Sequence, residues 1–579
     1  MTTAYRTHPV HMFPWLDLQQ GYGALAARIN AAAAATNGTL RVAIDGFSGV
    51  RWDRLVAQLA AALDACLGPT LPLTVLPTED LFPDESDLAE TLRPALTDDP
   101  VFGRLFHGHL SELWDPARVA ARRARIGRAR GLVLVVGPGA AGLVEPDLLM
   151  YVDMPKDVGQ ALARDGAVCP LGARTVAPFN LTYKRLFFVD WPVLNREKRR
   201  LLPHIDLYID GAALDAPTFA PGNEFRHALH ELSQQPFRVK PWFAPGPWGG
   251  QWMKERFGLP PDQPNYAWSF ELIAPENGVL LGSGDRVLEC SFDLLLWQET
   301  DAVLGARVAA RYGSLFPIRF DYLDTMGGTN LSCQVHPRVD AIREEFGEPL
   351  TQDESYYIVA NEPGARVFLG LRDDADVGAF RRAATAARDE HRPFDIADYV
   401  HSRASQPGDL FLIPSGTVHC SGKDNLVLEI SATPYIYTMK IYDYLRTDLG
   451  GNLRHVHLDH AFAALDPARR ASWVDERLTP PPRLLRQGDG WSEYAIGESD
   501  LLFYAVNRLE FAEGIDDTLP AAFVVLNLVE GERCDILAPG CPPLELRFAE
   551  TLIVPASVGR YTLRNRGEGA CKVVKAFVK

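Results

Sequence analysis

Short apolar runs alternate with amphipathic stretches in the first part of the chain. The run LRVAIDG after Thr39 is typical of a buried strand, and it leads through a glycine-containing turn into a predicted amphipathic helix. Leu55, Leu59, Leu63 and Cys66 are expected on one side of that helix. Further apolar runs at 131–136, 148–155 and 204–210 predict parallel strands. The pattern therefore indicates an α/β domain with a parallel sheet, which we place at residues 1–232.

The pattern of apolar and polar residues changes after residue 232. Prolines at 236, 241, 245 and 247 mark a connecting segment. Short β-like runs separated by turns follow, VLLG and VLECSF among them, and they predict an all-β region. A helical stretch around 457–478 and the prolines at 480–482 precede a last group of alternating runs. We therefore expect a β domain at 240–470 and a second β-barrel at 480–579.

Composition narrows the classes of partner. The 58 Lys and Arg residues against 74 Asp and Glu residues give a net charge of −16, which disfavours nucleic acid as a partner. The most apolar stretch, which starts at Gly131, is broken by Pro138, Glu145 and Asp147, so we expect no membrane span. The N-terminal residues have no signal-peptide pattern, and the eight cysteines have no CxxC spacing. We expect a cytoplasmic protein that acts on a small molecule, with a homo-oligomer left open.

The strand, glycine turn and helix near residue 46 follow the order by which nucleotide-binding α/β domains place phosphates at a helix N-terminus. With DLFPDESD and YVDMPKDV, this order resembles the uridine kinase and phosphoribulokinase group of P-loop kinases over residues 20–212. In the family's GxxxxGK[ST] motif, Arg51 stands at the second glycine, Trp52 at the lysine and Asp53 at the magnesium-binding hydroxyl. The phosphate-binding cation is lost and a carboxylate is added, so we expect no kinase activity. Ligand binding, an interface or regulatory role and a structural remnant stay open.

A metal-binding pattern occurs in the second region. Residues 408–419 read GDLFLIPSGTVH, which resembles the second metal-binding signature of the cupin β-barrel and ends at His419. Upstream, Gln334 and His336 are two residues apart and so lie on the same face of a strand. Together the two segments predict a metal held inside a double-stranded β-helix barrel.

Several sequence blocks in the same order resemble type I mannose-6-phosphate isomerases, which are zinc-dependent cupins, over residues 240–579. The blocks are KPWFAPGPWGG, AWSFELIAPENG, LDTMGGTNLSCQVHP, DESYYIVANEPGARVFLGL, PGDLFLIPSGTVH, NLVLEIS and IYDYLRTDLGG. The resemblance implies that His336, Glu354 and His419 are metal ligands, with Gln334 a fourth ligand or a close neighbour. Zinc suits this set of imidazole, carboxylate and amide groups, and other divalent metals do as well.

The same resemblance implies a reaction, the interconversion of mannose 6-phosphate and fructose 6-phosphate through an enediol. Arg446 matches the arginine of the family's YDYxR segment and is the best candidate for contact with substrate or transition state. Lys440 stands where the family has an arginine. It keeps the positive charge but lacks the planar guanidinium that binds phosphate or carboxylate through two hydrogen bonds. Glu271 matches a family glutamate near the site, although it could equally anchor a loop, and Asp443 is expected to be a structural partner.

Departures from the family pattern leave the substrate open. Gln352 and Asp353 stand where the family has a lysine and a threonine before the metal-binding glutamate, and Tyr356 stands where it has an aromatic residue after it. A cation is lost and an anion added, which weakens the case for a phosphorylated sugar. The alternatives are a non-catalytic metal-binding cupin that binds or senses a sugar, and a bifunctional kinase and isomerase.

The last group of alternating runs resembles the closing cupin of the same family. Where the first barrel has Thr417, Val418 and His419, it reads Val558, Gly559 and Arg560. We therefore expect a supporting barrel that holds no metal.

Overall fold

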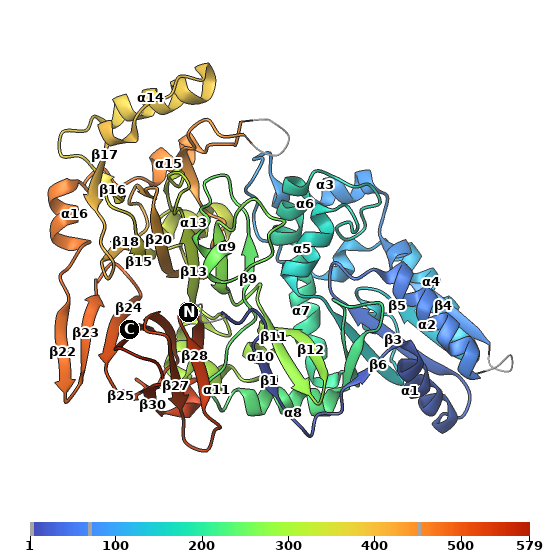
Figure 1. Ribbon diagram of the computed structural model, residues 1–579. Coiled ribbons are helices and arrows are strands. Elements are labelled where there is room, and N and C mark those ends of the chain that lie inside the picture. Colours follow the sequence, from blue (N-terminus) through green and yellow to red (C-terminus); the bar gives the residue numbers. More distant parts are fainter. Residues whose placement is uncertain (1–4, 68–71, 448–452) are drawn as a thin grey trace. The chain divides into compact units, whose positions relative to one another are not determined.

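The computed structural model describes residues 5–67, 72–447 and 453–579, shown in Figure 1. The chain divides into two compact units. The α/β unit comprises Val10–Leu232 and Pro275–Gln298. The β unit comprises the described residues before Val10 together with Ser233–Ala274 and Glu299–Lys579. Of the described helices, none is long and apolar enough to cross a membrane.

The α/β unit is built on a seven-stranded sheet with the order β2-β8-β7-β6-β3-β5-β4. Its parallel strands are β3 (Leu40–Gly46), β4 (Leu73–Pro77), β5 (Leu132–Val136), β6 (Leu148–Asp153) and β7 (Leu207–Asp210). Antiparallel pairing adds β8 (Thr218–Pro221) and β2 (Gln19–Gln20) at one edge. The strands predicted at 131–136, 148–155 and 204–210 are thus confirmed, as is a parallel sheet.

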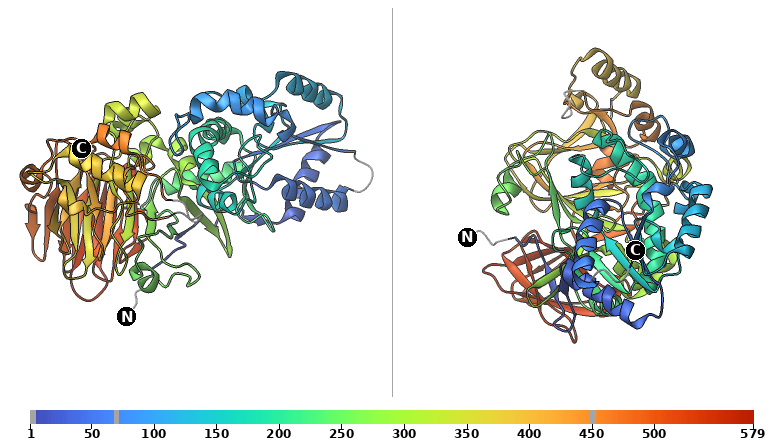
Figure 2. Two further views of the ribbon diagram at one scale, coloured as in Figure 1. Left: turned by 90° about the horizontal axis from the view of Figure 1, so that it is seen from above. Right: turned by 90° about the vertical axis from the view of Figure 1, so that its right-hand side faces the viewer.

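Helices pack on both faces of this sheet, as Figure 2 shows. They are α1 (Tyr22–Ala35), α2 (Trp52–Leu67), α3 (Glu85–Leu96), α4 (Pro116–Arg128), α5 (Lys156–Arg164), α6 (Phe179–Arg185), α7 (Trp191–Leu201) and α8 (Gly222–Leu232). As predicted, α2 buries Leu55, Leu59 and Leu63. Cys66, in the last turn of the helix, is exposed.

One segment of the α/β unit comes from a part of the sequence that we expected in the β domain. Residues 275–298 form the hairpin of β11 (Gly278–Ser283) and β12 (Arg286–Ser291), followed by α10 (Phe292–Gln298). Strand β1 (Val10–Met12) pairs in parallel with β11. The side chain of Ser291 donates to Asp153 at the end of β6 over 2.7 Å. The boundary at residue 240 therefore needs correction, because these strands pair with and bond to residues from the first part of the chain.

The first sandwich of the β unit has two sheets. A six-stranded sheet has the order β18-β15-β20-β13-β10-β9, and a five-stranded sheet has the order β17-β16-β19-β14-β21. The strands are β9 (Trp242–Ala244), β10 (Trp268–Leu272), β13 (Ile318–Asp324), β14 (Cys333–Val335), β15 (Glu354–Asn361), β16 (Arg366–Leu371), β17 (Val400–Ala404), β18 (Leu410–Ile413), β19 (His419–Ser421), β20 (Asn425–Ala432) and β21 (Met439–Tyr442). Most positions of β13, β15, β18 and β20 are buried, so the core lies against the six-stranded sheet.

Helices accompany this sandwich. They are α9 (Trp252–Arg256), α11 (Thr300–Leu304), α12 (Ala306–Tyr312), α13 (Val339–Phe346), α14 (Val377–Glu390), α15 (Leu458–Ala464) and α16 (Ala471–Arg477). The last two confirm the helical stretch predicted around 457–478.

The second sandwich follows the prolines at 480–482. Its sheets have the orders β22-β23-β24-β31-β26-β29 and β25-β30-β27-β28. The strands are β22 (Arg483–Gly488), β23 (Trp491–Gly497), β24 (Tyr504–Phe511), β25 (Gly514–Thr518), β26 (Val524–Glu530), β27 (Arg533–Leu537), β28 (Leu544–Arg547), β29 (Thr551–Val554), β30 (Arg560–Asn565) and β31 (Cys571–Val578). Apolar side chains from both sheets form one buried core. Both sandwiches belong to the same compact unit, whereas the sequence pattern suggested two domains.

Candidate metal centre

Three buried side chains of the β unit meet between the two sheets of the first sandwich. His419 opens β19 and His336 follows β14 directly, and these two strands are neighbours in the five-stranded sheet. Glu354 opens β15 in the six-stranded sheet. The possible ligand atoms of the three residues all lie within 4.8 Å of one another. The structure therefore brings together His336, Glu354 and His419, the three residues that the resemblance singled out as ligands.

The geometry aims one nitrogen of each imidazole at the carboxylate. His336 Nε2 lies 3.0 Å from Glu354 Oε1, and His419 Nε2 lies 3.2 Å from Glu354 Oε2. The Nδ1 atoms face backbone carbonyls, that of Tyr437 at 3.1 Å and that of Thr417 at 2.9 Å. Such outer contacts fix the ring orientation and leave Nε2 as the metal-binding atom.

The three groups perturb one another electrostatically. Burial opposes the charge of Glu354, but the two imidazoles beside it hold the pKa of this carboxyl well below its usual range. Burial likewise lowers the pKa of His336, and the Glu354 carboxylate outweighs burial and raises it. The buried site therefore holds an ionised Glu354 carboxylate beside the imidazole nitrogens of His336 and His419. Such a set of donors suits a divalent cation.

Two amide side chains border the cluster. Gln334 pairs with His419 in the β14–β19 register, and its Nε2 atom lies 3.2 Å from His419 Nε2. A metal would be bound by the amide oxygen, so the amide would have to rotate by half a turn. Gln352 Nε2 donates to Glu354 Oε1 over 2.5 Å and so orients the carboxylate. Gln352 thus has a defined role as a partner of the central carboxylate.

Asp353, another departure from the family pattern, and Tyr356, at the family's aromatic position, are also buried here. Asp353 Oδ1 accepts from the backbone N–H of Ser415 over 2.8 Å, which fixes the turn before His419. The Tyr356 ring packs edge-on against His419 at 5.9 Å between centroids. Its hydroxyl is buried and makes no hydrogen bond. The Asp353 carboxylate therefore has a structural role, because it holds the turn before His419.

A buried ionic network lies next to Glu354, and the sequence pattern did not lead us to predict it. Arg319 Nε lies 2.7 Å from Asp321 Oδ2, and the same guanidinium donates to Glu429. Burial and the nearby Glu354 charge raise the pKa of Glu429 to about 7, although Arg319 opposes the shift. Polar residues spaced two apart in otherwise apolar strands could have indicated this network, because they lie on one face of the strand. They are Arg319 with Asp321, and Glu429 with Ser431.

A cationic group lies at the end of β21. Lys440 pairs with Gln334 across β14 and β21, so both side chains share one face of the sheet. Asp443 Oδ2 lies 3.9 Å from Lys440 Nζ and 3.0 Å from Arg454 Nη1, and its Oδ1 lies 3.3 Å from Arg446 Nη2. Three cations thus surround one carboxylate, as expected if Asp443 is a structural partner. A cavity of about 130 Å³ adjoins the group, lined by Asp443, Arg446 and Arg454 among others.

The environment of these cations favours binding of an anion. Burial, together with the charge of Arg454, lowers the pKa of Lys440 to about 8. Arg446 donates through Nη2 to the Asn330 carbonyl over 2.8 Å, while its buried Nη1 makes no hydrogen bond. The hydrogen bonds within the protein therefore leave one guanidinium donor of Arg446 unused.

Glu271, in contrast, belongs to an anchor for the described N-terminal residues. Tyr5 and Ser269 donate to its Oε1, the latter over 2.6 Å, and the Thr551 backbone N–H donates to Oε2 over 3.2 Å. Both carboxylate oxygens are therefore engaged. These contacts favour the anchoring role that the sequence left open for Glu271 over contact with substrate.

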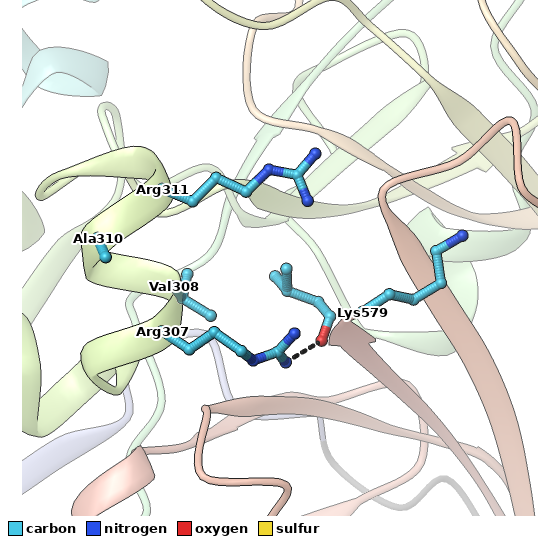
Figure 3. Close-up of a pocket in the computed structure, with 6 residues that line it drawn as sticks. Arg307, Val308, Ala310, Arg311 and Lys579 are labelled. Atoms are coloured by element: carbon cyan, nitrogen blue, oxygen red, sulfur yellow. Dashed lines mark hydrogen bonds between the residues drawn. The ribbon is translucent and has the colours of Figure 1, made fainter.

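Elsewhere in the β unit, a cavity of about 390 Å³ lies between α12 and the last strand, and Figure 3 shows its lining. Arg307 and Arg311 project into it, and Arg307 donates to the Val578 carbonyl over 2.8 Å. None of its lining residues belongs to the His336 cluster. Among the residues that the structure describes, that cluster is also the one group of three or more His, Cys, Asp or Glu side chains placed to hold a metal.

Known proteins resemble the two parts of the chain differently. A family model described as "Domain of unknown function" (DUF8485) matches residues 21–234, and it gives no support to the kinase-like frame expected there. Mannose-6-phosphate isomerase ManA of Bacillus subtilis is 28% identical over 339 residues, 58% of this chain and 98% of that protein. The mannose-6-phosphate isomerase of Streptococcus mutans is 24% identical over 320 residues, 54% of this chain and 89% of that protein. The crystal structure of the Bacillus subtilis mannose 6-phosphate isomerase covers 60% of this chain and 100% of its own, with 20% identity and a TM-score of 0.49.

Proposed function

We propose that the β unit is a metal-dependent aldose–ketose isomerase that interconverts mannose 6-phosphate and fructose 6-phosphate, or a closely related sugar pair. The observation that carries the proposal is the buried His336, Glu354 and His419 cluster, whose ligand atoms lie within 4.8 Å of one another. Similarity to mannose-6-phosphate isomerases, over nearly the full length of those relatives, supports the reaction class.

The donor set fits a divalent metal such as zinc. His336 Nε2 and Glu354 Oε2 are buried and make no hydrogen bond, so each has a lone pair to give to an ion. His419 Nε2 would be the third donor and Gln334 the fourth, and two imidazoles with a carboxylate are typical of catalytic zinc sites. When bound, the metal would act as a Lewis acid that polarises the carbonyl and hydroxyl oxygens at C1 and C2 of the sugar.

The chain's own residues supply the rest of the chemistry. Proton movement between C1 and C2 places negative charge on the enediol oxygens, and preorganised donors stabilise such charge. We assign this role to Arg446, whose Nη1 is unused, and to Lys440 beside it. Asp443 holds both cations in place. The Arg319 network keeps Glu354 in a fixed, charged environment, and burial excludes water from the cluster.

The cationic group also supports a phosphorylated substrate. Gln352 replaces the lysine of the family pattern, yet Lys440, Arg446 and Arg454 place three cations against the single Asp443 carboxylate. Such an excess of positive charge favours a phosphate dianion over a neutral sugar. A non-catalytic sugar-binding role is the second candidate, because Gln352 donates to Glu354 where a cation would be expected.

A coupled assay separates the two candidates. The full chain, with zinc added and with zinc removed by a chelator, should convert mannose 6-phosphate only in the presence of metal. His419→Ala and Glu354→Ala should abolish turnover, while Glu345→Ala, an exposed change outside the cluster, should leave it intact. Binding of mannose 6-phosphate without turnover would favour the binding role, and full activity in both cluster variants would reject the metal-dependent isomerase.

For the α/β unit we propose a P-loop kinase-like frame without kinase activity. The parallel order β4-β5-β3-β6-β7 and the turn from β3 to α2 support the frame. Trp52 and Asp53 at the start of α2 argue against phosphoryl transfer. ATP turnover by the full chain would contradict the second part.

A further inference from the structure

One short turn contacts two of the three candidate metal ligands. Residues 414–418 connect β18 to β19, and His419 is the first residue of β19. His419 Nδ1 lies 2.9 Å from the Thr417 carbonyl oxygen, so the turn sets the direction of the imidazole. The Gly416 backbone N–H donates to the His336 carbonyl over 2.9 Å. A movement of this turn would therefore displace His419 and disturb His336.

A single guanidinium braces the turn. Arg469 Nη1 donates to the Pro414 carbonyl over 2.7 Å and to the Ser415 carbonyl over 2.6 Å. The same nitrogen donates to Thr417 Oγ1 over 2.5 Å. The Arg469 side chain is 12% exposed, so water competes little for these acceptors, and hydrogen bonds from a charged donor are the stronger kind. Arg469 therefore holds three acceptors of the turn at one point.

The position of Arg469 is itself fixed. Its Nε lies 3.4 Å from Asp466 Oδ2, and its guanidinium lies 5.8 Å from the centre of the Trp473 ring in α16. The Asp466 backbone N–H donates to the Gly416 carbonyl, and the Leu371 backbone N–H donates to the Arg469 carbonyl, each over 2.9 Å. The guanidinium therefore reaches the turn from backbone that is bonded on both sides.

The next residue provides a comparison within the same segment. Arg470 Nη1 donates to the carbonyls of Arg372 and Asp373, each over 2.9 Å, and to that of Ala375 over 3.1 Å. The segment 372–375 carries none of the candidate metal ligands. Both arginines thus brace a loop through one nitrogen and three acceptors, but only Arg469 braces a loop that leads into a ligand.

We propose that Arg469 is a positioning residue of the metal centre, which holds the turn before His419 so that Nε2 of this imidazole stays aimed at the metal. The inference rests on the metal centre of the proposed function. Without Arg469, three acceptors shielded from most of the water lose their donor, and the turn is free to move. A group that orients a metal ligand in this way typically contributes about 10- to 100-fold to metal affinity.

Zinc affinity of the full chain tests this role without the sugar reaction. Competition with a chromophoric chelator gives the zinc dissociation constant of each variant. Arg469→Met removes the donors but keeps an unbranched side chain, and it should weaken zinc binding at least about tenfold. Arg469→Lys keeps the positive charge and should recover part of that loss. Arg470→Met is the matched control and should keep the wild-type zinc affinity.

Cobalt in place of zinc reports the geometry of the ligands. Cobalt binds the same kinds of ligand, and its visible absorption depends on their number and arrangement. Displacement of His419 in Arg469→Met should therefore change the cobalt spectrum, whereas Arg470→Met should give the wild-type spectrum. A general loss of stability would leave the spectrum of the folded protein unchanged. Thermal unfolding of the metal-free proteins shows whether both variants fold.

The results separate this role from the metal centre itself. Wild-type zinc affinity and an unaltered cobalt spectrum in folded Arg469→Met would overturn the role of Arg469, and so would an equal loss of affinity in Arg470→Met. Absence of zinc binding by the wild-type chain would instead reject the metal centre, and with it both the proposed function and this role.

Discussion

Glu354→Gln tests the metal centre most directly, because it keeps the shape of the side chain and removes only the charge. Glu354 lies 3.0 Å from His336 Nε2 and 3.2 Å from His419 Nε2, and its side chain is 1% exposed. Loss of an outer partner of a metal ligand commonly weakens binding 10- to 100-fold, so loss of the anionic ligand itself should cost at least about 100-fold, or about 2.7 kcal/mol.

The effect can be measured without the reaction. With free zinc at about 1,000 times its dissociation constant, binding stabilises the folded wild-type protein by about 4.1 kcal/mol. An affinity lower by about 100-fold leaves about 1.4 kcal/mol at the same zinc concentration. Zinc-dependent thermal shifts and zinc content after dialysis should therefore fall sharply in Glu354→Gln.

Glu348→Gln is the matched control for this experiment. Glu348 is a half-buried carboxyl of the same sandwich that accepts from the Tyr437 hydroxyl, and it lies outside the ligand cluster. Burial raises the pKa of Glu348 to about 7, so the change removes about half a charge at neutral pH. Wild-type zinc affinity in Glu354→Gln would refute the assignment of the carboxylate as a ligand.

Further expectations concern both units. Arg446→Met should lower kcat/KM for the sugar phosphate by roughly 100-fold while zinc content stays unchanged, and an unaltered kcat/KM would exclude Arg446 from substrate contact. Lys198→Met should destabilise the α/β unit by about 3–5 kcal/mol in denaturant titrations, because it leaves the buried Asp153 without the cation at 2.8 Å, and adding Asp153→Asn should restore part of the loss. Despite burial, Lys198 lowers the pKa of Asp153 to about 2, so this carboxylate stabilises the fold fully above about pH 4, and the contribution, about 2 kcal/mol, is lost as the pH falls through about 2. Acid titrations of stability in that window should be less steep for Asp153→Asn. Chelation should lower the unfolding temperature of the β unit and leave that of the α/β unit unchanged, since all three cluster residues lie in the β unit; two shifted transitions would contradict this.

The central cluster could be predicted because its signals are local. His419 ends a motif with a fixed turn, and Gln334 and His336 lie two residues apart on one strand, so a short window contains the evidence. The Arg319 and Glu429 pair is formed across β13 and β20, more than a hundred residues apart, and its geometry depends on pairing between strands. Polar residues in those apolar strands were visible, but the sequence did not indicate their partners.

The fold shows the same division between local and distant information. Strands β3, β5, β6 and β7 follow from apolar runs, and the buried face of α2 follows from helical spacing. The sequence pattern of β11 and β12 also predicts strands. The unit to which they belong, however, depends on the pairing of β11 with β1, which lies far earlier in the chain. Glu271 was ambiguous for the same reason, since its partner Tyr5 lies 266 residues away.

The anchor at the start of the chain has a consequence for the order of events during synthesis. Arg6 donates to Glu550 through Nε over 2.9 Å, a contact that spans 544 residues, whereas residues 10–232 form most of the α/β unit. As the ribosome releases the chain, the α/β unit can begin to fold while Arg6 still has no carboxylate to bind. Completion of the β unit must wait until Glu550 emerges, and nascent chains arrested before that point should leave residues 5–9 open to proteolysis.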